Sequence, residues 1–538
     1  MFRDTVVVAI GTAISRLTGL LRIIVFGVII GQTALADAFD GANNSPNSIY
    51  ELLVGGVLAA GLVPLFTQLA SQQKDADDDE GTQAVVTVSL IALIAATVVA
   101  IAAAPLIFRM FSLNPSSSVS ASQFRNVGTV MTRIFLIQIF FYGLTAIATA
   151  LLNARRRFVA AAWAPVLSNL VIISSLLVIP FTRDGTPTLD DALNDKTFFL
   201  LLTLGSTAGI AAMAIVLIPA LRVAGFKWRF TPQFKHPAVR SLARLSAWTF
   251  GYVITNQIAL IAIKNLARPG SGDQDAYSKA FTFFMLPHGL LAISIATTFV
   301  PELARRVQES DRDGFATWMT SGLRWIGLLT LPASAGMLIL SHPIVSALLE
   351  HGHFDSAAAT NTARALSGFA IGLVGFSIYI FTLRGFYSHQ DTRTPFFINL
   401  FENTINIILA ILLVDRHGVF GLGLAFGIAY SISAVLAIAI LHTRYAAIKW
   451  ASLGLLFWRA VVATCAMAAV LQLMQVRLES ISSLARFGEV FLCITAGLII
   501  YIGGLYALRI PEIRKLKAHL VASATTAQSP YVADDQNL

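Results

Sequence analysis

Long apolar runs separated by short polar stretches recur along the whole of this 538-residue chain. A helix needs about 20 mostly apolar residues to cross the hydrocarbon core of a membrane. We count fourteen such runs, with centres near residues 17, 55, 94, 138, 170, 209, 252, 290, 332, 375, 404, 430, 464 and 496. The pattern predicts an all-α, polytopic membrane protein with about 14 transmembrane helices.

Composition supports this class of protein. Hydrophobic residues make up 56% of the chain and charged residues 12%, and the mean hydropathy is +0.73; soluble domains carry about 25% charged residues. The two cysteines, Cys465 and Cys493, lie in apolar runs and provide neither a disulfide framework nor a zinc site. The apolar start of the chain is interrupted by Arg16 and Arg22, so we expect a retained first helix and not a cleaved signal peptide.

The distribution of Lys and Arg predicts how the chain is oriented. If the N-terminus is cytoplasmic, the segments on that side hold about twice as many Lys and Arg as those on the other side. The basic stretches 154–158 and 222–244 then face the cytoplasm, and so does the acidic stretch 72–81, although acidic residues weigh little in this rule. We expect both termini in the cytoplasm, and we interpret the net charge of +9 as a topology signal and not as nucleic-acid binding.

An internal repeat predicts how the helices are grouped. The Val63-Pro64 pair and its surroundings recur around Val300-Pro301, six predicted helices later, so the two copies have the same orientation. Parallel repeats of this kind are typical of transporters that bind their substrate between two halves. The expected parts are an N-terminal six-helix lobe (1–225), a parallel C-terminal six-helix lobe (226–448), two extra helices (449–510) and a polar cytoplasmic tail (511–538).

The second predicted span is unusually polar. Residues 36–56 hold two aspartates, a glutamate, three asparagines and Pro46. Irregular or polar chain at membrane depth is tolerated only where protein buries it or where it lines a water-filled cavity. Either the segment is a bent helix satisfied by its neighbours, or it is the wall of a hydrated cavity; we favour the wall. The candidate lining residues are Asp37, Asp40, Asn43, Asn44 and Glu51.

Two arginines in the first span point to the same cavity. A charge at the centre of a membrane helix costs about 2.5 to 3.5 kcal/mol on insertion scales, so Arg16 and Arg22 are expected to have a structural or functional role. They lie about 120° apart around a helix and about 9 Å apart along it. They form either a structural lock with Asp37 and Asp40, or a cationic cavity for an anionic ligand such as a phosphate.

A second polar group lies in the eleventh predicted span. Glu402, Asn403 and Asn406 carry oxygen atoms that suit a cation site, although polar groups at such spacing more often serve helix packing. The sequence predicts no cofactor and no firm metal site. It leaves the energy source open between the membrane potential and coupling to Na⁺ or H⁺.

Several motifs together resemble one known family. They keep their order and spacing along almost the whole chain: "SRLTGLLR" (15–22), "ADAF" (36–39), "PN" (46–47), "GGVLAAGLVP" (55–64), "LNARRRFVAAAWAPVLSNL" (152–170), "LPHGLLAISIATTFVPELAR" (286–305) and "YSHQDTRTPFF" (387–397). In these segments the chain is similar to the MurJ/MviN family of lipid II flippases, within the multidrug/oligosaccharidyl-lipid/polysaccharide exporter superfamily. By motif position, Arg16, Arg22 and Asp37 match family residues regarded as functionally important.

The resemblance implies a fold, a cargo and partners. It implies two lobes around a cationic cavity, a lipid-tail groove at helices 13 and 14, and alternating access. It implies that lipid II (undecaprenyl-pyrophosphoryl-MurNAc-pentapeptide-GlcNAc) moves from the inner to the outer leaflet of the cytoplasmic membrane. The implied partners are lipid II, membrane lipid, and proteins of cell-wall synthesis or division.

The chain departs from the family pattern at three places. Ile23 follows Arg22 where the family usually has Asp, Tyr50-Glu51 stand where it often has two arginines, and Thr282 stands at a common arginine position. The cavity is then either less cationic than in relatives, or Lys264 and Lys279 compensate.

Other functions fit the sequence less well. The nearest alternative is a flippase or exporter of the same superfamily with another lipid-linked saccharide as cargo. An enzyme is not expected, because the Asp-x-Asp pattern in "DADDDE" (75–80) lacks a soluble fold to hold a sugar nucleotide. A mere scaffold would not need Arg16 and Arg22 at membrane depth.

Overall fold

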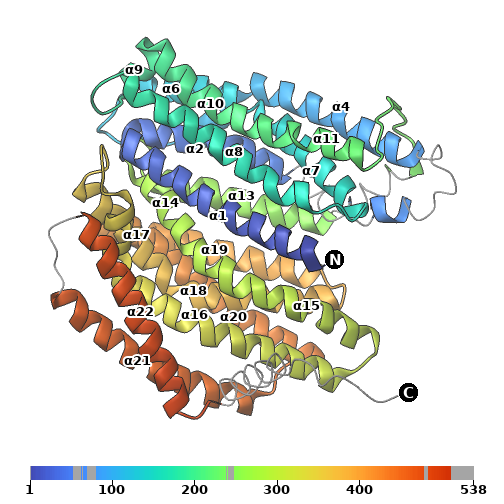
Figure 1. The fold of residues 1–538 in the computed structure, drawn as a ribbon, viewed down its shortest axis with the longest axis vertical. Coiled ribbons are helices and arrows are strands. Elements are labelled where there is room, and N and C mark those ends of the chain that lie inside the picture. Colours follow the sequence, from blue (N-terminus) through green and yellow to red (C-terminus); the bar gives the residue numbers. More distant parts are fainter. Residues whose placement is uncertain are drawn as a thin grey trace, which may run out of the picture.

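The computed structural model describes residues 2–52, 62, 65–69, 80–237, 239, 247–477 and 483–510. Within these ranges the regular structure is helical throughout (Figure 1). Eleven segments are long and apolar enough to cross a membrane, and a twelfth results if one helix pair bent by 50° is counted as a single span. The all-α, polytopic class predicted from the sequence is confirmed, and the total of fourteen spans stays a prediction.

Most helices end where the apolar runs give way to polar residues. In chain order they are α1 (Phe2–Ile30), α2 (Ala34–Tyr50), α4 (Glu80–Ala102), α5 (Ala104–Met110), α6 (Ala121–Phe135), α7 (Gln138–Ala154), α8 (Val159–Val178), α9 (Leu189–Asn194), α10 (Lys196–Ile215), α11 (Leu217–Val223), α13 (Ala247–Leu266), α14 (Asp273–Pro287), a π segment (His288–Ala292), α15 (Ile293–Gln308), α16 (Arg312–Leu349), the bent pair α17 (Ser356–Ile371) and α18 (Leu373–Ser388), α19 (Arg393–His417), α20 (Val419–Tyr445), α21 (Trp450–Arg477) and α22 (Ser483–Ala507).

The helices gather into two bundles with an appended pair. Helices α1 to α11 pack on one another to form the first bundle, and α13 to α20 pack together as the second bundle (Figure 1). Helices α21 and α22 pack on each other and on α16, where Leu340, Met467 and Leu471 belong to one buried apolar cluster. The lobe boundaries expected at residues 225 and 448 stay predictions.

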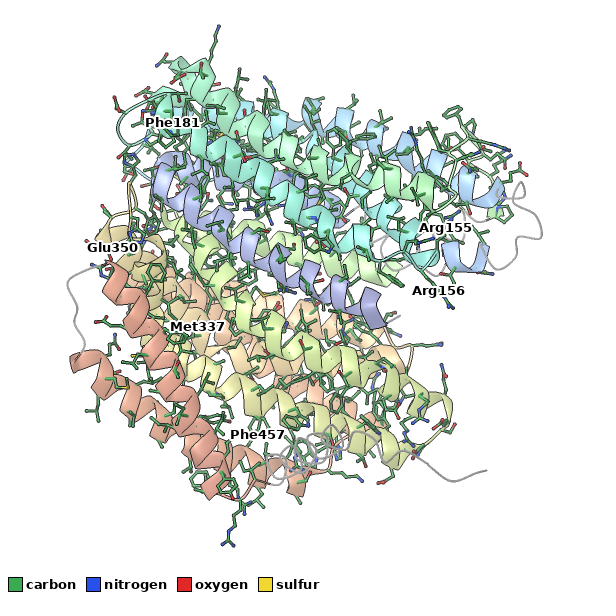
Figure 2. The ribbon with its side chains drawn as sticks, in the orientation of Figure 1. Arg155, Arg156, Phe181, Met337, Glu350 and Phe457 are labelled. Carbon is green, nitrogen blue, oxygen red and sulfur yellow. The ribbon has the colours of Figure 1, made fainter. Side chains whose placement is uncertain are left out.

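The two ends of the molecule differ in charge. Figure 2 shows Arg155 and Arg156 at one end and Phe181 and Glu350 at the other. We call the first of these the basic end, formed by residues 154–158, 222–229 and 305–312.

Hydrogen bonds between the two bundles lie at the end opposite the basic end. The His353 amide donates to the Val28 carbonyl at 2.9 Å, and the Ser116 amide donates to the Pro269 carbonyl at 2.8 Å. The Asn265 side-chain amide donates to the Met110 carbonyl at 2.7 Å. In Figure 1 the bundles converge at this end and diverge toward the basic end. The structure is therefore a state whose bundles are joined at one end.

The polar second segment is helical. Helix α2 begins after Thr33, whose hydroxyl accepts a hydrogen bond from the Ala36 amide, and it continues through Pro46 to Tyr50. Pro46 therefore does not break the helix. The Val63-Pro64 half of the repeat and the tail 511–538 lie outside the described residues.

Candidate functional site

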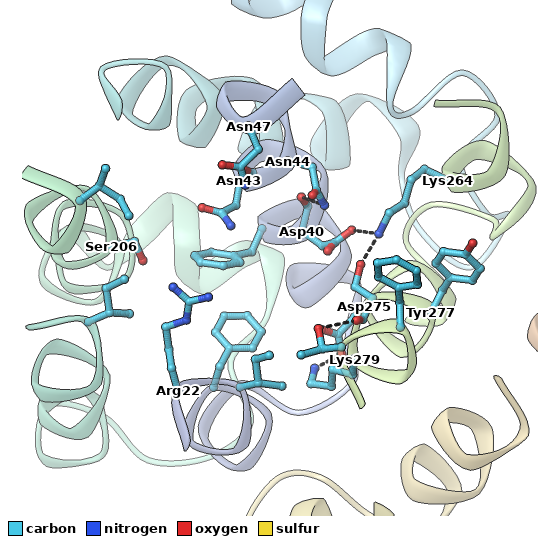
Figure 3. A pocket seen from close by; sticks show the side chains of 18 of the residues that line it. Arg22, Asp40, Asn43, Asn44, Asn47, Ser206, Lys264, Asp275, Tyr277 and Lys279 are labelled. Atoms are coloured by element: carbon cyan, nitrogen blue, oxygen red, sulfur yellow. Dashed lines mark hydrogen bonds and ion pairs between the residues drawn. The ribbon is translucent and has the colours of Figure 1, made fainter. Parts of the chain in front are cut away.

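A polar cavity of about 470 Å³ lies where the two bundles meet. Helices α1, α2, α7, α8 and α10 of the first bundle line it together with α13 and α14 of the second (Figure 3). The structure brings together six of the residues predicted from the sequence: Arg22, Asp40, Asn43, Asn44, Lys264 and Lys279. The polar second segment is thus one wall of a cavity, with its asparagines turned toward the space.

Arg22 differs from the other basic residues of the cavity. Its side chain points into the space, near the asparagines of α2 (Figure 3). Among the described residues no acidic side chain forms an ion pair with it, and Tyr142 is a close neighbour. A partly buried guanidinium without a carboxylate partner offers planar donors that match phosphate oxygens.

Lys264 is buried, and its ammonium group has three partners. Its Nζ is 2.5 Å from Asp40 Oδ2, it donates to the Ser278 hydroxyl, and it donates to the Gln274 carbonyl at 3.3 Å. The side chain is 2% exposed. A buried ammonium of this kind is stable only with such partners, so Asp40 neutralises Lys264 and joins α2 to α13.

Lys279 is held in a similar way from its own helix. It forms an ion pair with Asp275, one turn earlier on α14, and both side chains are buried. Its Nζ also lies over the rings of Phe26 and Phe354, at 5.2 and 5.4 Å from their centroids. Aromatic faces favour a cation at such distances. The cavity therefore contains two neutralised lysines and one unpaired arginine.

Asp37 lies beside the cavity and not in its lining. Its carboxylate is fully buried and accepts hydrogen bonds from the backbone amides of Gly270 and Gly272, both at 2.8 Å, and of Asp275 at 2.9 Å. Gly270 and Gly272 have φ angles of +91° and +89°, which residues other than glycine rarely adopt. Asp37 thus fixes α2 to the start of α14, where the bundles are joined.

Neither aspartate of α2 pairs with an arginine in this structure. Asp37 binds backbone amides and Asp40 binds Lys264, so the Arg–Asp lock considered from the sequence does not form here. Arg16 lies outside the cavity lining, with its guanidinium against Gly289 of the π segment, so close that a Cβ there would overlap it. It therefore contacts the second bundle directly.

Two further predicted positions lie away from the cavity. Glu51 follows the last residue of α2 and is exposed, and the Tyr50 ring packs against that of Tyr142 at a tilt of 40°, with ring centroids 5.2 Å apart. Thr282, which stands at a common arginine position of the family, does line the cavity.

Some residues of the cavity were not predicted. Asp275 is four residues before Lys279, a helical spacing that favours an ion pair and was readable from the sequence. Asn47 shares a helix face with Asn43 and was readable in the same way. No sequence signal indicates Tyr142 or Ser206, which come from other helices.

A separate polar cluster lies inside the second bundle. Glu402 of α19 is fully buried; no hydrogen bond of good geometry reaches its carboxylate oxygens from the described residues, although the Tyr430 hydroxyl lies close to the carboxylate. On the same helix face, Asn399 and Asn403 both donate to the Asn256 side-chain oxygen at 2.9 Å. The side-chain oxygens of Asn399 and Asn406 are also buried without partners. Such a set of oxygens fits a small cation or a proton on Glu402.

Comparisons with known proteins agree on one family. The family model described as lipid II flippase MurJ matches residues 26–487. The lipid II flippase MurJ of Burkholderia cenocepacia is 28% identical over 440 residues, covering 81% of this chain and 83% of the relative. The probable lipid II flippase MurJ of Vibrio cholerae is 26% identical over 451 residues, covering 82% of each.

Solved structures show the same fold. A structure of lipid II flippase MurJ in an inward closed conformation superposes with a TM-score of 0.75 at 23% identity, covering 94% of this chain and 99% of that one. An inward-facing multidrug transporter of the MATE family, within the MOP superfamily, gives a TM-score of 0.58 at 16% identity, covering 81% and 99%.

Proposed function

This chain belongs to the lipid II flippase MurJ family, and from that premise we propose that it moves lipid II from the inner to the outer leaflet of a bacterial cytoplasmic membrane. The observation that carries the proposal is the cavity at the junction of the bundles, with Arg22 as its unpaired cation. The pyrophosphate of lipid II cannot cross hydrocarbon unshielded, and a guanidinium in a wet cavity provides donors for its oxygens.

The charges of the cavity suit an anionic head group. Three basic and two acidic side chains line it, which leaves a net charge of +1. Arg22 is the first contact for the pyrophosphate, because it can bind the ligand without first breaking an ion pair to a carboxylate. Lys264 and Lys279 become further donors only if the ligand replaces Asp40 and Asp275, so these pairs tune how tightly the cargo is held.

The hydrogen bonds between the bundles support a proposal for the stage of the transport cycle. We place the basic end in the cytoplasm, because Lys and Arg accumulate on cytoplasmic segments. The bundles are then joined at the outer end, by Asp37 and by the His353–Val28 hydrogen bond, and this state receives cargo from the inner leaflet. Alternating access requires these contacts to break and others to form at the basic end.

The cargo can be tested in the host cell. Depletion of the protein is expected to lower lipid II on the outer face of the cytoplasmic membrane, and the wild-type gene is expected to restore it. Other lipid-linked saccharides exposed on the outer face serve as the control. If these fall while lipid II stays unchanged in a strain without a redundant flippase, the cargo is another saccharide of the same superfamily.

The appended helices have a place in the same proposal. Helices α21 and α22 lie on α16, outside the two bundles that form the cavity. We assign to them the groove that holds the undecaprenyl tail while the head group enters the cavity. This separation keeps the apolar tail in the bilayer and the charged head group in water.

We further propose that the Glu402 cluster binds the cation that drives the cycle. Its unpartnered oxygens fit Na⁺ or a proton, and the supporting amides come from both α13 and α19. The test compares the apparent melting temperature of purified wild type and Glu402→Gln in NaCl, in KCl and across pH. Stabilisation by Na⁺ alone that is lost in the variant supports a Na⁺ site, and a pH dependence that is lost supports a proton. If wild type and variant respond alike, Glu402 does not bind the coupling cation.

A further inference from the structure

An extended segment after α11 is fixed along the first turns of α4. The Gln83 side chain donates to the Lys227 carbonyl at 2.9 Å and accepts from the Arg229 amide at 2.7 Å. One turn later, the Thr87 hydroxyl accepts from the Thr231 amide at 3.1 Å. Gln83 and Thr87 are buried, so these contacts hold residues 227–231 in one conformation although they belong to no helix.

The same segment holds large aromatic side chains out of the protein. Trp228, Phe230 and Phe234 are 53%, 65% and 59% exposed. The Trp228 indole N–H donates to the Thr87 hydroxyl at 3.3 Å, and the ring meets Phe230 edge to face with centroids 6.3 Å apart. The conformation of the aromatic pair is therefore fixed, yet nothing in the described chain covers it.

Basic residues alternate with these rings. Lys227 and Lys235 are exposed next to the aromatic side chains. Figure 1 shows the segment projecting beyond α4 and α11, on the side of the first bundle that faces away from the second. It lies at the basic end, level with the first turn of α4. Helix α4 is long and apolar enough to cross a membrane, so this turn is expected near the membrane surface. Aromatic rings are enriched at this depth, and lysines beside them face the head groups.

We propose that residues 227–235, which we call the interfacial segment, form a docking surface for anionic phospholipid head groups of the leaflet at the basic end. The rings lie among the upper acyl chains, and Lys227 and Lys235 contact phosphates. Because Gln83 and Thr87 already fix the backbone, binding orders little additional chain. The charge of the two lysines is complementary to an anionic lipid. In an extended segment neighbouring side chains point to different sides, so the aromatic rings can face the acyl chains while the lysines face the phosphates.

The proposal is tested on the purified full-length protein by native mass spectrometry in detergent. Phosphatidylglycerol and phosphatidylcholine are titrated separately, and lipid-bound species are counted. We expect the wild type to retain phosphatidylglycerol in preference to phosphatidylcholine. Lys227→Gln/Lys235→Gln is expected to weaken phosphatidylglycerol binding roughly thirtyfold, since each of the two lysines near an anionic surface strengthens binding about fivefold.

Matched controls separate this surface from others on the protein. Lys196→Gln removes an exposed lysine at the opposite end, and Phe181→Ser removes a ring that is 89% exposed there. Trp228→Ser/Phe230→Ser is expected to lower binding of both lipids, and the Phe181→Ser control is expected to leave it unchanged. The lysine pair needs no change to packed side chains, so it tests the proposal even if the aromatic variant fails to fold.

Two outcomes would overturn the proposal. One is equal retention of phosphatidylglycerol by the wild type and Lys227→Gln/Lys235→Gln. The other is an equal loss in Lys196→Gln, which would mean that total charge and not this surface attracts the lipid. Either result would favour a protein partner, and not a lipid, as the ligand of the exposed rings.

Discussion

The central cavity and the Glu402 cluster both place charge at membrane depth, but they satisfy it in different ways. In and beside the cavity, carboxylates have partners: Asp40 binds Lys264, and Asp37 binds three backbone amides. In the cluster, neither oxygen of Glu402 receives a hydrogen bond of good geometry or an ion pair from the described part of the chain, and the Tyr430 hydroxyl is its close polar neighbour. When one member of a buried ion pair or hydrogen-bonded pair is removed, the remaining polar group is left buried without a partner, which lowers stability. Neutralising a buried charge that has no partner instead removes its desolvation cost.

This difference separates two uses of a buried charge. The satisfied carboxylates build the structure of the cavity and join the bundles, and the unsatisfied one is suited to a ligand that comes and goes. Charge removal should therefore lower stability on the cavity side and leave it unchanged or raise it at the cluster.

The largest effect is expected at Asp37. Asp37→Ala removes the acceptor for three buried backbone amides, and each buried donor left without a partner costs about 1 to 3 kcal/mol, so we expect a loss of roughly 3 to 9 kcal/mol in stability. Thermal unfolding of the purified protein measures this as a lower apparent melting temperature. Asp37→Asn, which keeps one acceptor oxygen, should lose less. A melting temperature equal to that of the wild type would show that Asp37 does not join the bundles.

A smaller loss is expected when the Asp40–Lys264 pair is broken. Lys264→Met leaves the carboxylate of Asp40 without its cation, which costs about 3 kcal/mol for a buried pair. The double variant Asp40→Asn/Lys264→Met should recover much of this loss, because no uncompensated charge remains. Additive losses in the double variant would contradict direct coupling of the two side chains.

At the cluster we expect the opposite sign. Glu402→Gln replaces an unpartnered carboxylate with a neutral amide of the same size, so stability should stay unchanged or rise by about 1 kcal/mol in the absence of Na⁺. The same melting assay, in a buffer without sodium, compares this variant with the cavity variants. A loss as large as that of Lys264→Met would place Glu402 among the satisfied carboxylates.

The smallest effect concerns a carboxylate outside the membrane-spanning helices. Burial tends to raise the pKa of Asp191, but hydrogen bonds from Thr188 and the Arg183 guanidinium outweigh it and hold the pKa below its usual value. The ionised Asp191 therefore contributes to the stability of the folded protein above the unfolded pKa of about 3.9. This contribution is lost as the pH falls through the lower pKa of the folded state. Because the pair lies at the surface and is partly reached by solvent, the loss should stay under about 1 kcal/mol. Asp191→Asn should remove this part of the pH dependence of unfolding, and an unaltered profile would exclude the contribution.

The sequence predicts the membrane class and much of the cavity, because apolar run length and polar residues at membrane depth are local signals. Arg22, Asp40, Asn43 and Asn44 were found in this way, and all of them line one space. What each group binds could not be predicted. The partner of Asp40 lies 224 residues away, and the amides that hold Asp37 belong to a glycine turn more than 230 residues away. Such contacts depend on how the two bundles pack against each other, and local sequence patterns do not predict this packing.

The central claim is that Arg22 binds the pyrophosphate of the cargo, and its most direct test is transport in cells that depend on a single variant. Lipid II on the outer face of the membrane is measured with the wild type, with Arg22→Ala, and with Arg133→Ala, which removes an exposed arginine of α6 outside the cavity. With equal membrane insertion, we expect Arg22→Ala to lower outer-face lipid II at least about tenfold, since a charged hydrogen bond is worth roughly 1.5 to 3 kcal/mol, and Arg133→Ala to behave as wild type. Full transport by Arg22→Ala would contradict the account.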